Sequence, residues 1–392
     1  MNSEPHSVRK NIWINIIFFA VTTLGGVLGV PIYYHYYGVT AGEIALALFF
    51  ASATGLSITV GYHRLFSHAT FKANPVVRFL LLFFGAAAFE QPALMWASQH
   101  RDHHRYVDTD LDPYSIKKGF FYAHVGWLIF WEHKINYENA KDLQQDPVLM
   151  HQFNHYLLWC SFAGIIFPVL IGAMMGHALG AFLLSVCLRI TFVYHSTFCI
   201  NSVCHMFGKS TYDIEASAKD HWLVAIITGG EGYHNFHHRF PSDYRNGVRW
   251  YHFDPSKWLI ALMERLHLAW DLKTVSMFRI LGAQLAAENK RMRQGLEKTV
   301  LSTKLTQALE SLKHHYQRLS ENLTRWENVA QKEYRLVLSQ PLKVHAAAMD
   351  KEARKQIEEA RQKFKATYHR WAELMRQEPR HLAQVLLSSA LI

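Results

Sequence analysis

Four apolar runs, each close to twenty residues long, constrain the fold of this chain more than any other feature. They begin at Asn11, Glu43, His155 and Ala178. A helix needs about 20 mostly apolar residues to cross the roughly 30 Å hydrocarbon core of a bilayer. The sequence therefore predicts an all-α integral membrane protein with four transmembrane helices, over residues 11–38, 43–62, 155–176 and 178–200.

Two further segments bear on the membrane fold. The run 76–96 is apolar but carries Arg78, Glu90 and a proline, so we expect it to lie in the interface rather than across the bilayer. The fourth run continues without a break to Gly208. As a single helix from Ala178 it would be about 45 Å long at 1.5 Å per residue, and would pass beyond the membrane surface.

Lysine and arginine are unevenly distributed between the links that join the runs. The links between runs one and two, and between three and four, contain neither residue. Basic residues instead precede run one or lie between runs two and three, including Arg9, Lys10, Arg64, Lys72, Arg101, Lys117 and Lys118. By the positive-inside rule both termini and the histidine-rich segments are expected on the cytoplasmic side. The net charge of +10 is expected to border anionic lipid, and no nucleic-acid partner is expected.

Histidines gather in three short clusters. HRLFSH holds His63 and His68, HRDHH holds three histidines, and HNFHH holds three more. In the last two clusters the spacing is i, i+3, i+4, which places all three rings on one face of a helix. Neutral imidazole is the commonest metal ligand in proteins. Eight candidates exceed the four ligands of one structural zinc site, so they indicate two ions.

Two positions need particular geometry. His63 and His68 would diverge by about 140° on an ideal α-helix, so they converge only across a helix end or a bend. Run two was expected to end there, at Tyr62. A ninth candidate, His205, lies four residues after Asn201 on the extended fourth helix. Spacing alone does not name the metal, because imidazole also suits zinc and copper.

These clusters and their neighbours resemble a known family. HRLFSHATFKA, HRDHHRYVDTDLDP, GFFYAHVGW, NSVCHMFG and GGEGYHNFHHRFPSDYR are similar to the histidine boxes of integral-membrane fatty acyl desaturases, most of all the stearoyl-CoA (delta-9) type. The resemblance extends from about Asn11 to Val275. It implies two iron ions in a helical cytoplasmic cap, held by His63, His68, His100, His103, His104, His205, His234, His237 and His238, with Asn201 acting through water.

The resemblance also implies a reaction. A cis double bond would be placed in a saturated long-chain acyl group, carried as acyl-CoA or as a glycerolipid, using O2 and two electrons. The donor would be a separate ferredoxin-, rubredoxin- or cytochrome b5-like protein. Two alternatives stay open: a fatty acyl or alkyl hydroxylase on the same diiron scaffold, and a membrane metal or haem electron carrier.

Substrate contacts follow from the same resemblance. Trp96 and Thr197 match residues that bend the substrate tunnel, and Asn11 matches a contact to the acyl carrier. The animal enzymes carry charged contacts to coenzyme A where this chain has Ser98, Gln99, Trp131 and Glu132. We therefore expect weaker or differently placed recognition of coenzyme A.

Some charged residues were assigned roles from their position alone. Asp102, Asp108 and Glu231 lie near the histidines in sequence and are candidates to orient the rings through their free N–H groups. Arg189 lies near the middle of run four, where a charge is costly and by default functional. The four cysteines form no C-x-x-C pair and are expected to be buried and reduced.

The sequence divides into a membrane desaturase domain, residues 1–274, and a cytoplasmic, coiled-coil-like tail, residues 275–392. One apolar seam of the tail has alternating spacings of four and three: Leu305, Leu309, Leu312, Tyr316, Leu319, Leu323 and Trp326. Pro341 interrupts it, and a second seam follows at Ile357, Ala360, Phe364, Tyr368, Trp371 and Leu374. These seams predict a helical hairpin or small bundle, with a dimerising coil or a dock for the electron donor as the alternatives.

Overall fold

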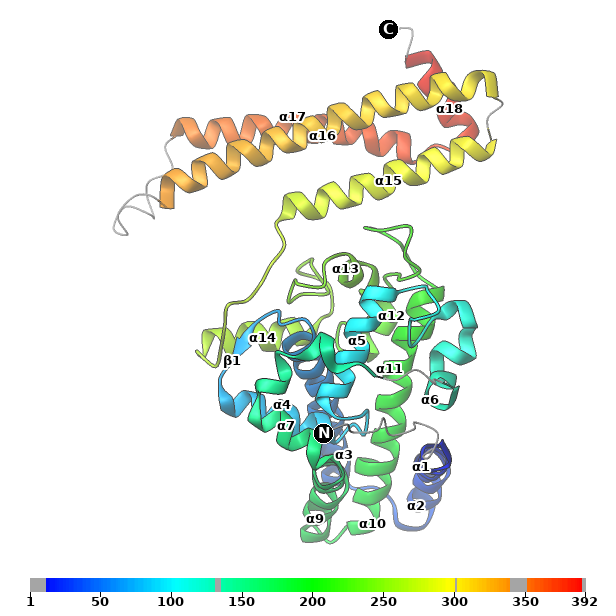
Figure 1. The fold of residues 1–392 in the computed structure, drawn as a ribbon, viewed down its shortest axis with the longest axis vertical. Helices are drawn as coiled ribbons and strands as arrows, with labels where there is room; N and C mark the ends of the chain where they lie inside the picture. Colours follow the sequence, from blue (N-terminus) through cyan, green and yellow to red (C-terminus); the bar gives the residue numbers. More distant parts are fainter. Residues whose placement is uncertain (1–11, 131–134, 300–301, 339–350, 390–392) are drawn as a thin grey trace. The chain divides into compact units, whose positions relative to one another are not determined.

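The computed structural model describes residues 12–130, 135–299, 302–338 and 351–389, and this part of the chain is mostly helical (Figure 1). Its two strands, β1 (Lys72–Ala73) and β2 (Ala269–Trp270), form one short antiparallel pair. The chain divides into two compact units. The first comprises residues 1–210 and 216–274, and the second comprises residues 211–215 and 275–392.

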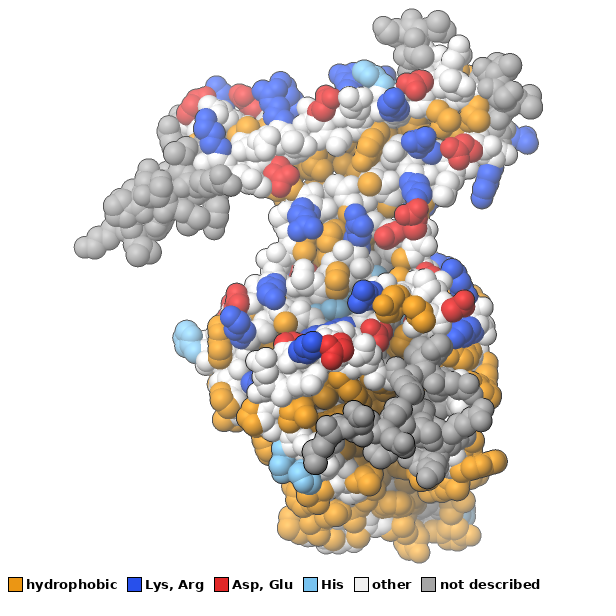
Figure 2. All heavy atoms as spheres, viewed as in Figure 1, with side chains coloured by type: hydrophobic (Ala, Val, Ile, Leu, Met, Phe, Trp, Pro, Cys, Tyr) orange, Lys and Arg blue, Asp and Glu red, His pale blue; other side chains and the backbone are white. Residues whose placement is uncertain are grey.

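Four helical segments of the first unit are long and apolar enough to cross a membrane: Trp13–Tyr37, Ala41–Ser67, Tyr156–Met174 and Ala178–Met206. They confirm the four predicted spans. Their outward side chains are largely hydrophobic, as the orange atoms over this part of the unit show (Figure 2). The fourth segment passes beyond the predicted span and carries His205 near its end, as expected.

The second span is longer than predicted. It consists of α3 (Ala41–Leu56) followed directly by η3, a π-helix over Ser57–Ser67. Thr40 caps its start: the Thr40 hydroxyl accepts the amide of Glu43, and the Glu43 carboxylate accepts the amide of Thr40 at 2.8 Å. The expectation that this helix ends at Tyr62 was therefore wrong, because the chain changes to π-winding at Ser57 and continues to Ser67.

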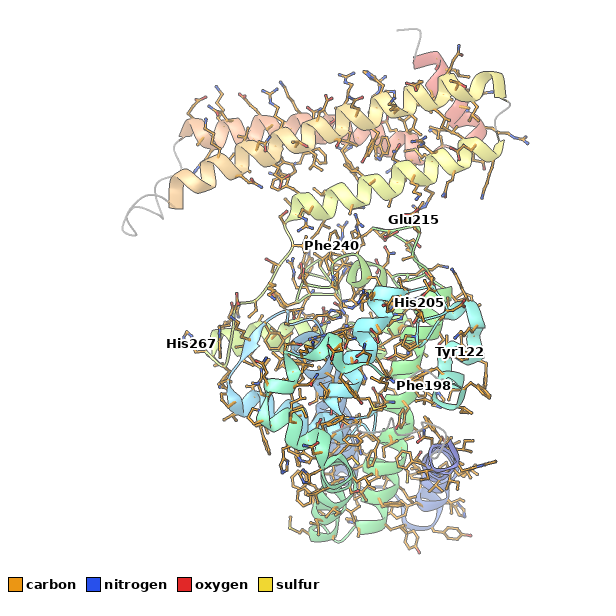
Figure 3. The ribbon with its side chains drawn as sticks, in the orientation of Figure 1. Tyr122, Phe198, His205, Glu215, Phe240 and His267 are labelled. Carbon is orange, nitrogen blue, oxygen red and sulfur yellow. The ribbon has the colours of Figure 1, made fainter. Side chains whose placement is uncertain are left out.

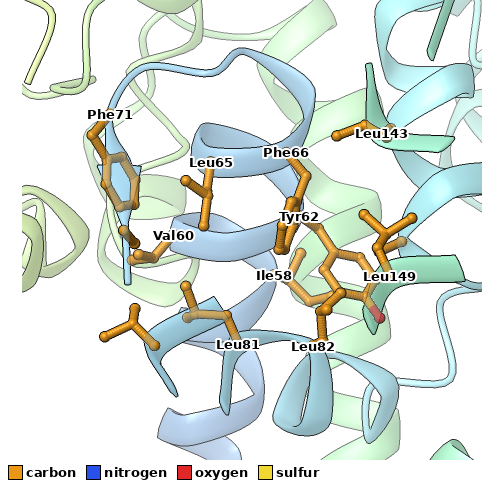
Figure 4. Close-up of a cluster of buried hydrophobic side chains, with 14 of the residues drawn as sticks. Ile58, Val60, Tyr62, Leu65, Phe66, Phe71, Leu81, Leu82, Leu143 and Leu149 are labelled. Atoms are coloured by element: carbon orange, nitrogen blue, oxygen red, sulfur yellow. The ribbon is translucent and has the colours of Figure 1, made fainter. Parts of the chain in front are cut away.

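The predicted interfacial run forms α4 (Pro75–Ala86), a helix of 12 residues that is too short to count among the candidate spans. One face, with Leu81 and Leu82, packs on Ile58 and Tyr62 of η3 in the largest buried cluster of the described chain (Figure 4). The opposite face exposes Val76, Phe79 and Leu80. An apolar helix with one buried and one exposed face suits a position in the membrane interface.

Arg189 lies at the start of α11 (Arg189–Met206), which follows α10 (Ala178–Ala181) and the π-helix η9 (Phe182–Leu188) in the fourth span. Its side chain is only 2% exposed. The guanidinium donates to the carbonyls of Ser185 at 2.6 Å, Ala87 at 2.6 Å and Gly164 at 2.8 Å. These bonds tie the helix of Arg189 to the segments that contain Ala87 and Gly164. The functional role expected from its cost stays a prediction.

The second unit contains α15 (Met277–Thr299), α16 (Ser302–Leu338), α17 (Lys351–Met375) and α18 (Pro379–Ser389). Trp326 contacts Phe364 and Tyr316 contacts Trp371, so α16 and α17 run antiparallel. Both predicted seams lie in or against one apolar core, to which α15 and α18 contribute Leu285, Leu296 and Leu386. The apolar seams are therefore covered by other helices of the same chain, as in a helical bundle. Pro341 lies outside the described residues.

Candidate metal centre

Nine histidine side chains of the first unit converge in two groups. The first group contains His63, His68, His100, His104 and His237, and the second contains His103, His205, His234 and His238. Within each group the candidate ligand nitrogens all lie within 4.8 Å of one another. These are the nine histidines expected from the sequence, and the two groups are able to bind metal ions.

Two short helices divide their histidines between the groups in the same way. α5 (Ala93–Tyr106) sends His100 and His104 to the first group and His103 to the second. α13 (His234–Arg239) sends His234 and His238 to the second group and His237 to the first. In each helix the residues at i and i+4 share one metal position, and the residue at i+3 serves the other. Both helices therefore link the two positions rigidly.

The spacing of the ring nitrogens fits ligands around a cation. His205 Nε2 lies 3.0 Å from His234 Nε2, and His103 Nε2 lies 3.2 Å from His238 Nε2. Two ligands about 2.1 Å from one ion, at roughly a right angle or a little more, are about 3.0–3.4 Å apart. His103 Nδ1 faces the Asp112 carboxylate, which accepts a hydrogen bond, so Nδ1 carries the proton and Nε2 presents its lone pair toward the other rings. A cation bound there would accept this lone pair.

Burial favours the neutral form of several of these imidazoles. It lowers the pKa of His68, His100 and His104 well below the usual range, and nearby histidines add to the effect. The pKa values of the three α13 histidines are lowered in the same way, first by burial. A neutral ring offers its lone pair to a metal at physiological pH, whereas an imidazolium does not.

Polar residues behind the rings fix their orientation. His103 Nδ1 lies 2.7 Å from Asp112, His205 Nδ1 lies 2.6 Å from the Ser217 hydroxyl, and His63 Nδ1 lies 2.8 Å from Glu231. Such outer contacts set the tautomer and raise the basicity of the ligand nitrogen. Each group therefore holds one histidine paired with a carboxylate.

The sequence-based candidates for these outer contacts were only partly right. Glu231 contacts a ring directly. Asp108 contacts the residues behind the rings instead of a ring itself. Its carboxylate accepts from the backbone amide of Ser217 at 2.8 Å, and its own amide donates to Asp112 at 3.1 Å. Asp102 was a wrong candidate, because its carboxylate accepts from Asn139 at 2.9 Å instead. Asp112 was missed, since sequence alone did not distinguish it from the other aspartates of the DTDLDP turn.

A buried charge network supports Glu231. Arg64 is 1% exposed and lies 3.1 Å from Glu231 and 3.1 Å from Asp254. Asn246 donates to Glu231 at 2.6 Å. The guanidinium pairs with two carboxylates, so no charge of this network is buried alone, which would be costly. The network holds the carboxylate that faces His63.

An apolar cavity of about 1290 Å³ adjoins the metal centre, and His63, His100 and His234 belong to its lining. Asn201 also lines it, one helical turn before His205 on α11. Figure 3 labels His205 and Phe198 on this helix. The remaining lining is mostly hydrophobic and comes largely from the spans, including Phe18, Leu48, Phe192 and Phe198, with Met95 from α5. This is the usual character of a site for a largely apolar ligand.

The two predicted bend residues share one partner in this cavity. Thr197 donates to Glu90 Oε1 at 2.8 Å, and Trp96 Nε1 donates to Glu90 Oε2 at 3.3 Å. Trp96 in turn stacks on His100, with ring centroids 4.9 Å apart. The partners of Glu90 were not predicted from the sequence, where Glu90 counted only against a membrane span. Glu90 is the one carboxylate of the run 76–96, and this was the signal that could have identified it.

The backbone around Glu90 is strained. Phe89 and Gln91, on either side of it, have φ angles of 61° and 81°, which non-glycine residues rarely adopt. The Tyr194 hydroxyl donates to the Phe89 carbonyl at 2.6 Å and holds the turn. Burial raises the pKa of the Glu90 carboxyl to about 7. Such strain persists where surrounding structure enforces it, often at functional sites.

The structure describes only two of the residues expected to bear on recognition of the acyl carrier, Ser98 and Gln99. Asn11, Trp131 and Glu132 lie outside the described residues. Ser98 is fully buried, and its hydroxyl donates to Asn139 at 2.8 Å, so it does not reach a carrier at the surface. Gln99 lines the cavity.

The fold and the site define a class: a helical membrane protein with two histidine-rich metal positions beside an apolar cavity. The chain belongs to the fatty acid desaturase family, whose sequence profile, described as "Fatty acid desaturase", matches residues 41–271.

Individual relatives agree with this assignment. A "Probable acyl-CoA desaturase" of Schizosaccharomyces pombe is 44% identical over 59% of this chain and 49% of its own length. "Acyl-CoA desaturase 1" of Saccharomyces cerevisiae is 36% identical over 71% of this chain and 55% of its own length. "Stearoyl-CoA desaturase 4" of Mus musculus is 34% identical over 75% of this chain and 83% of its own length. The chain thus spans only about half the length of the two yeast relatives.

Proposed function

We propose that this protein is an O2-dependent desaturase that introduces a cis double bond, of the delta-9 type, into a saturated long-chain acyl group. One observation carries the proposal: two groups of histidines adjoin a large apolar cavity, and three of those histidines belong to its lining. The names of the relatives support an acyl-CoA substrate. Because Ser98 is buried, a glycerolipid remains the other carrier that fits.

The metals we assign are two iron ions. Iron supplies the chemistry that this reaction needs, because it binds and reduces dioxygen and so provides an oxidant for unactivated methylenes. The five-histidine group would hold one ion. The four-histidine group would hold the other, with Asn201 contributing through water from the face of α11 that carries His205.

The residues of the chain bind and orient the substrate. The apolar lining takes the hydrocarbon chain out of water, and Trp96, Thr197 and Glu90 form a hydrogen-bonded constriction beside His100. A constriction at a fixed distance from the metals would select the carbons that react. Precise placement of a substrate accounts for a large share of many enzymes' rate enhancement.

The overall reaction balances with two external electrons. A saturated –CH2–CH2– unit, O2, two protons and two electrons give –CH=CH– and two water molecules. The saturated chain is oxidised and dioxygen is reduced. We assign the electrons to a separate ferredoxin-, rubredoxin- or cytochrome b5-like protein, and place both termini and the metal centre on the cytoplasmic side.

The test is product analysis with two carriers. The purified protein in lipid nanodiscs, with a reduced donor, is given stearoyl-CoA in one reaction and a distearoyl phospholipid in the other. Released fatty acids are derivatised across any double bond and examined by mass spectrometry. The proposal predicts a cis bond between carbons 9 and 10 from at least one carrier. A hydroxylated chain, or a double bond at another position, would overturn it.

A further inference from the structure

The positive charge of the protein is concentrated after Thr274. Residues 275–392 contain 21 of the 41 lysines and arginines but only 12 of the 31 aspartates and glutamates. These 118 residues therefore carry +9 of the net charge of +10, and the membrane unit before them is nearly neutral. Most of the net positive charge therefore belongs to the helical bundle.

The basic residues form a stripe along α16. Arg318, Arg325 and Lys332 are spaced by seven residues, so they share one face of the helix, and all three are exposed. None of the three is in an ion pair with a described carboxylate. A second row on α17 contains Arg354, Lys365 and Arg376, all exposed, together with Arg361, which pairs with Glu358 at 3.2 Å. Figure 2 shows lysine and arginine side chains across the visible face of this unit.

The bundle surface offers charge without apolar anchors. Most of its hydrophobic side chains lie in or against its own core. Met277, at the start of α15, is exposed, and after it no large hydrophobic side chain of the described residues is exposed. A helix that binds the membrane interface needs an apolar face to insert, and an obligate dimer needs a large apolar contact. A hydrophilic, basic surface instead favours fast, weak and salt-dependent association with an acidic protein.

The proposed reaction supplies such a partner. Each turnover consumes two electrons, and small electron-transfer proteins dock through small, transient interfaces. We infer that the C-terminal bundle is a docking surface for an acidic electron-transfer protein, which recognises the basic stripe of α16. This inference rests on the proposed function, since only an oxidative enzyme requires the donor.

The test compares three forms of the full-length protein in nanodiscs made of zwitterionic lipid. The first is the native chain. The second carries Arg318→Glu, Arg325→Glu and Lys332→Glu. The third carries Arg318→Lys, Arg325→Lys and Lys332→Arg, which keeps the charge at the same positions. The probe is a strongly acidic [2Fe–2S] ferredoxin, added oxidised for binding measurements and reduced for turnover.

The charge-reversed form should bind ferredoxin at least about tenfold more weakly at low salt, with a matching rise in its KM for the donor. The charge-conserving form should behave like the native chain. In about 0.5 M salt the forms should converge, because the Debye length falls to roughly 4 Å. Turnover driven by a small chemical reductant should be equal in all three forms, which shows that the metal centre is intact.

Equal ferredoxin affinity in all three forms would overturn the inference. If reversal instead lowers activity only in nanodiscs containing phosphatidylglycerol, the stripe binds anionic lipid and the inference is likewise overturned. Binding is measured without turnover, so it tests the docking surface even if no reductant yields product. If no reductant yields product, the proposed function is contradicted. The binding comparison still decides whether the bundle is a docking surface.

Discussion

The amide of His68 donates to the carbonyl of His63, five residues earlier, at 3.1 Å, and their imidazole rings lie 4.9 Å apart. This bond closes the last turn of η3. A π-helix has more residues per turn than an α-helix, so residues five apart come close to one face. The five-residue spacing of His63 and His68 seemed to require a helix end. In a π-helix the same spacing suits two ligands of one metal.

The second metal position should depend on His205. Replacing His205 with alanine removes one of four histidines from that group, so bound iron should fall from two toward one per chain and desaturation should be abolished. Iron is measured by plasma mass spectrometry on the purified, folded protein. His177→Ala is the control: His177 precedes α10 and belongs to neither histidine group. Normal iron content and turnover in the His205 variant would remove it from the site.

Asp112 should tune the metal through His103. Asp112→Ala leaves His103 Nδ1 without its carboxylate at 2.7 Å, and loss of such a contact typically lowers metal affinity or activity about 10–100-fold. Iron retention against a chelator measures the effect. Asp110→Ala is matched to it, because Asp110 lies on the same turn but is exposed. The orienting role is wrong if the two variants retain iron equally.

Glu90 should make the free energy of unfolding depend on pH. Its folded pKa of about 7 lies above the ordinary value of 4.5, so the unfolded chain releases this proton at lower pH than the folded chain. The contribution of Glu90 to stability is therefore greatest below about pH 4.5, falls by roughly 3 kcal/mol up to about pH 7, and is constant above. Glu90→Gln should remove this slope from unfolding curves measured between those pH values. An unchanged slope would show that Glu90 is not the titrating group.

Glu90 should also affect product position. Glutamine keeps a side-chain oxygen for the Trp96 N–H and an amide N–H for the Thr197 hydroxyl, whereas Glu90→Ala removes both contacts. Glu90→Ala should therefore broaden the distribution of double-bond positions, and Glu90→Gln should preserve it. Mass spectrometry of derivatised products separates these outcomes. Identical distributions for alanine and the native chain would exclude a positioning role.

The position at which the chain is truncated should decide whether the shortened protein stays folded. Ending the chain after Thr274 removes all four helices of the bundle and should leave both histidine groups with their iron. Ending it after Gln340 removes α17 and α18 and uncovers Leu312, Leu319 and Trp326 of α16, so that form should aggregate. Size-exclusion chromatography and iron analysis test both forms. Loss of iron from a folded chain ending at Thr274 would contradict the division into domains.

The features that sequence could predict are local or repetitive. Each span is recognisable as about 20 successive apolar residues. The histidine triads of α5 and α13 are recognisable by a spacing that fits one helix face. The seams on α16 and α17 likewise indicated helices that pack together.

The features that sequence could not predict depend on contacts between distant segments. The π-winding of η3 is not distinguished by residue type from the α-helix before it. The partnership of Asp112 with His103 and of Glu90 with Thr197 depends on how turns fold back onto helices. The partners of Arg189 could not be predicted for the same reason, since Ala87 and Gly164 lie far from it in the sequence.

The most direct test of the central claim is the fate of oxygen and hydrogen in one reaction. The purified protein, a reduced donor and a saturated acyl substrate are incubated under ¹⁸O₂, and lipid and water are both analysed by mass spectrometry. A desaturase predicts a lipid product lighter by two hydrogens, without ¹⁸O, and ¹⁸O in the water formed. A hydroxylated lipid that retains ¹⁸O, or an unchanged lipid despite donor oxidation, would contradict the account.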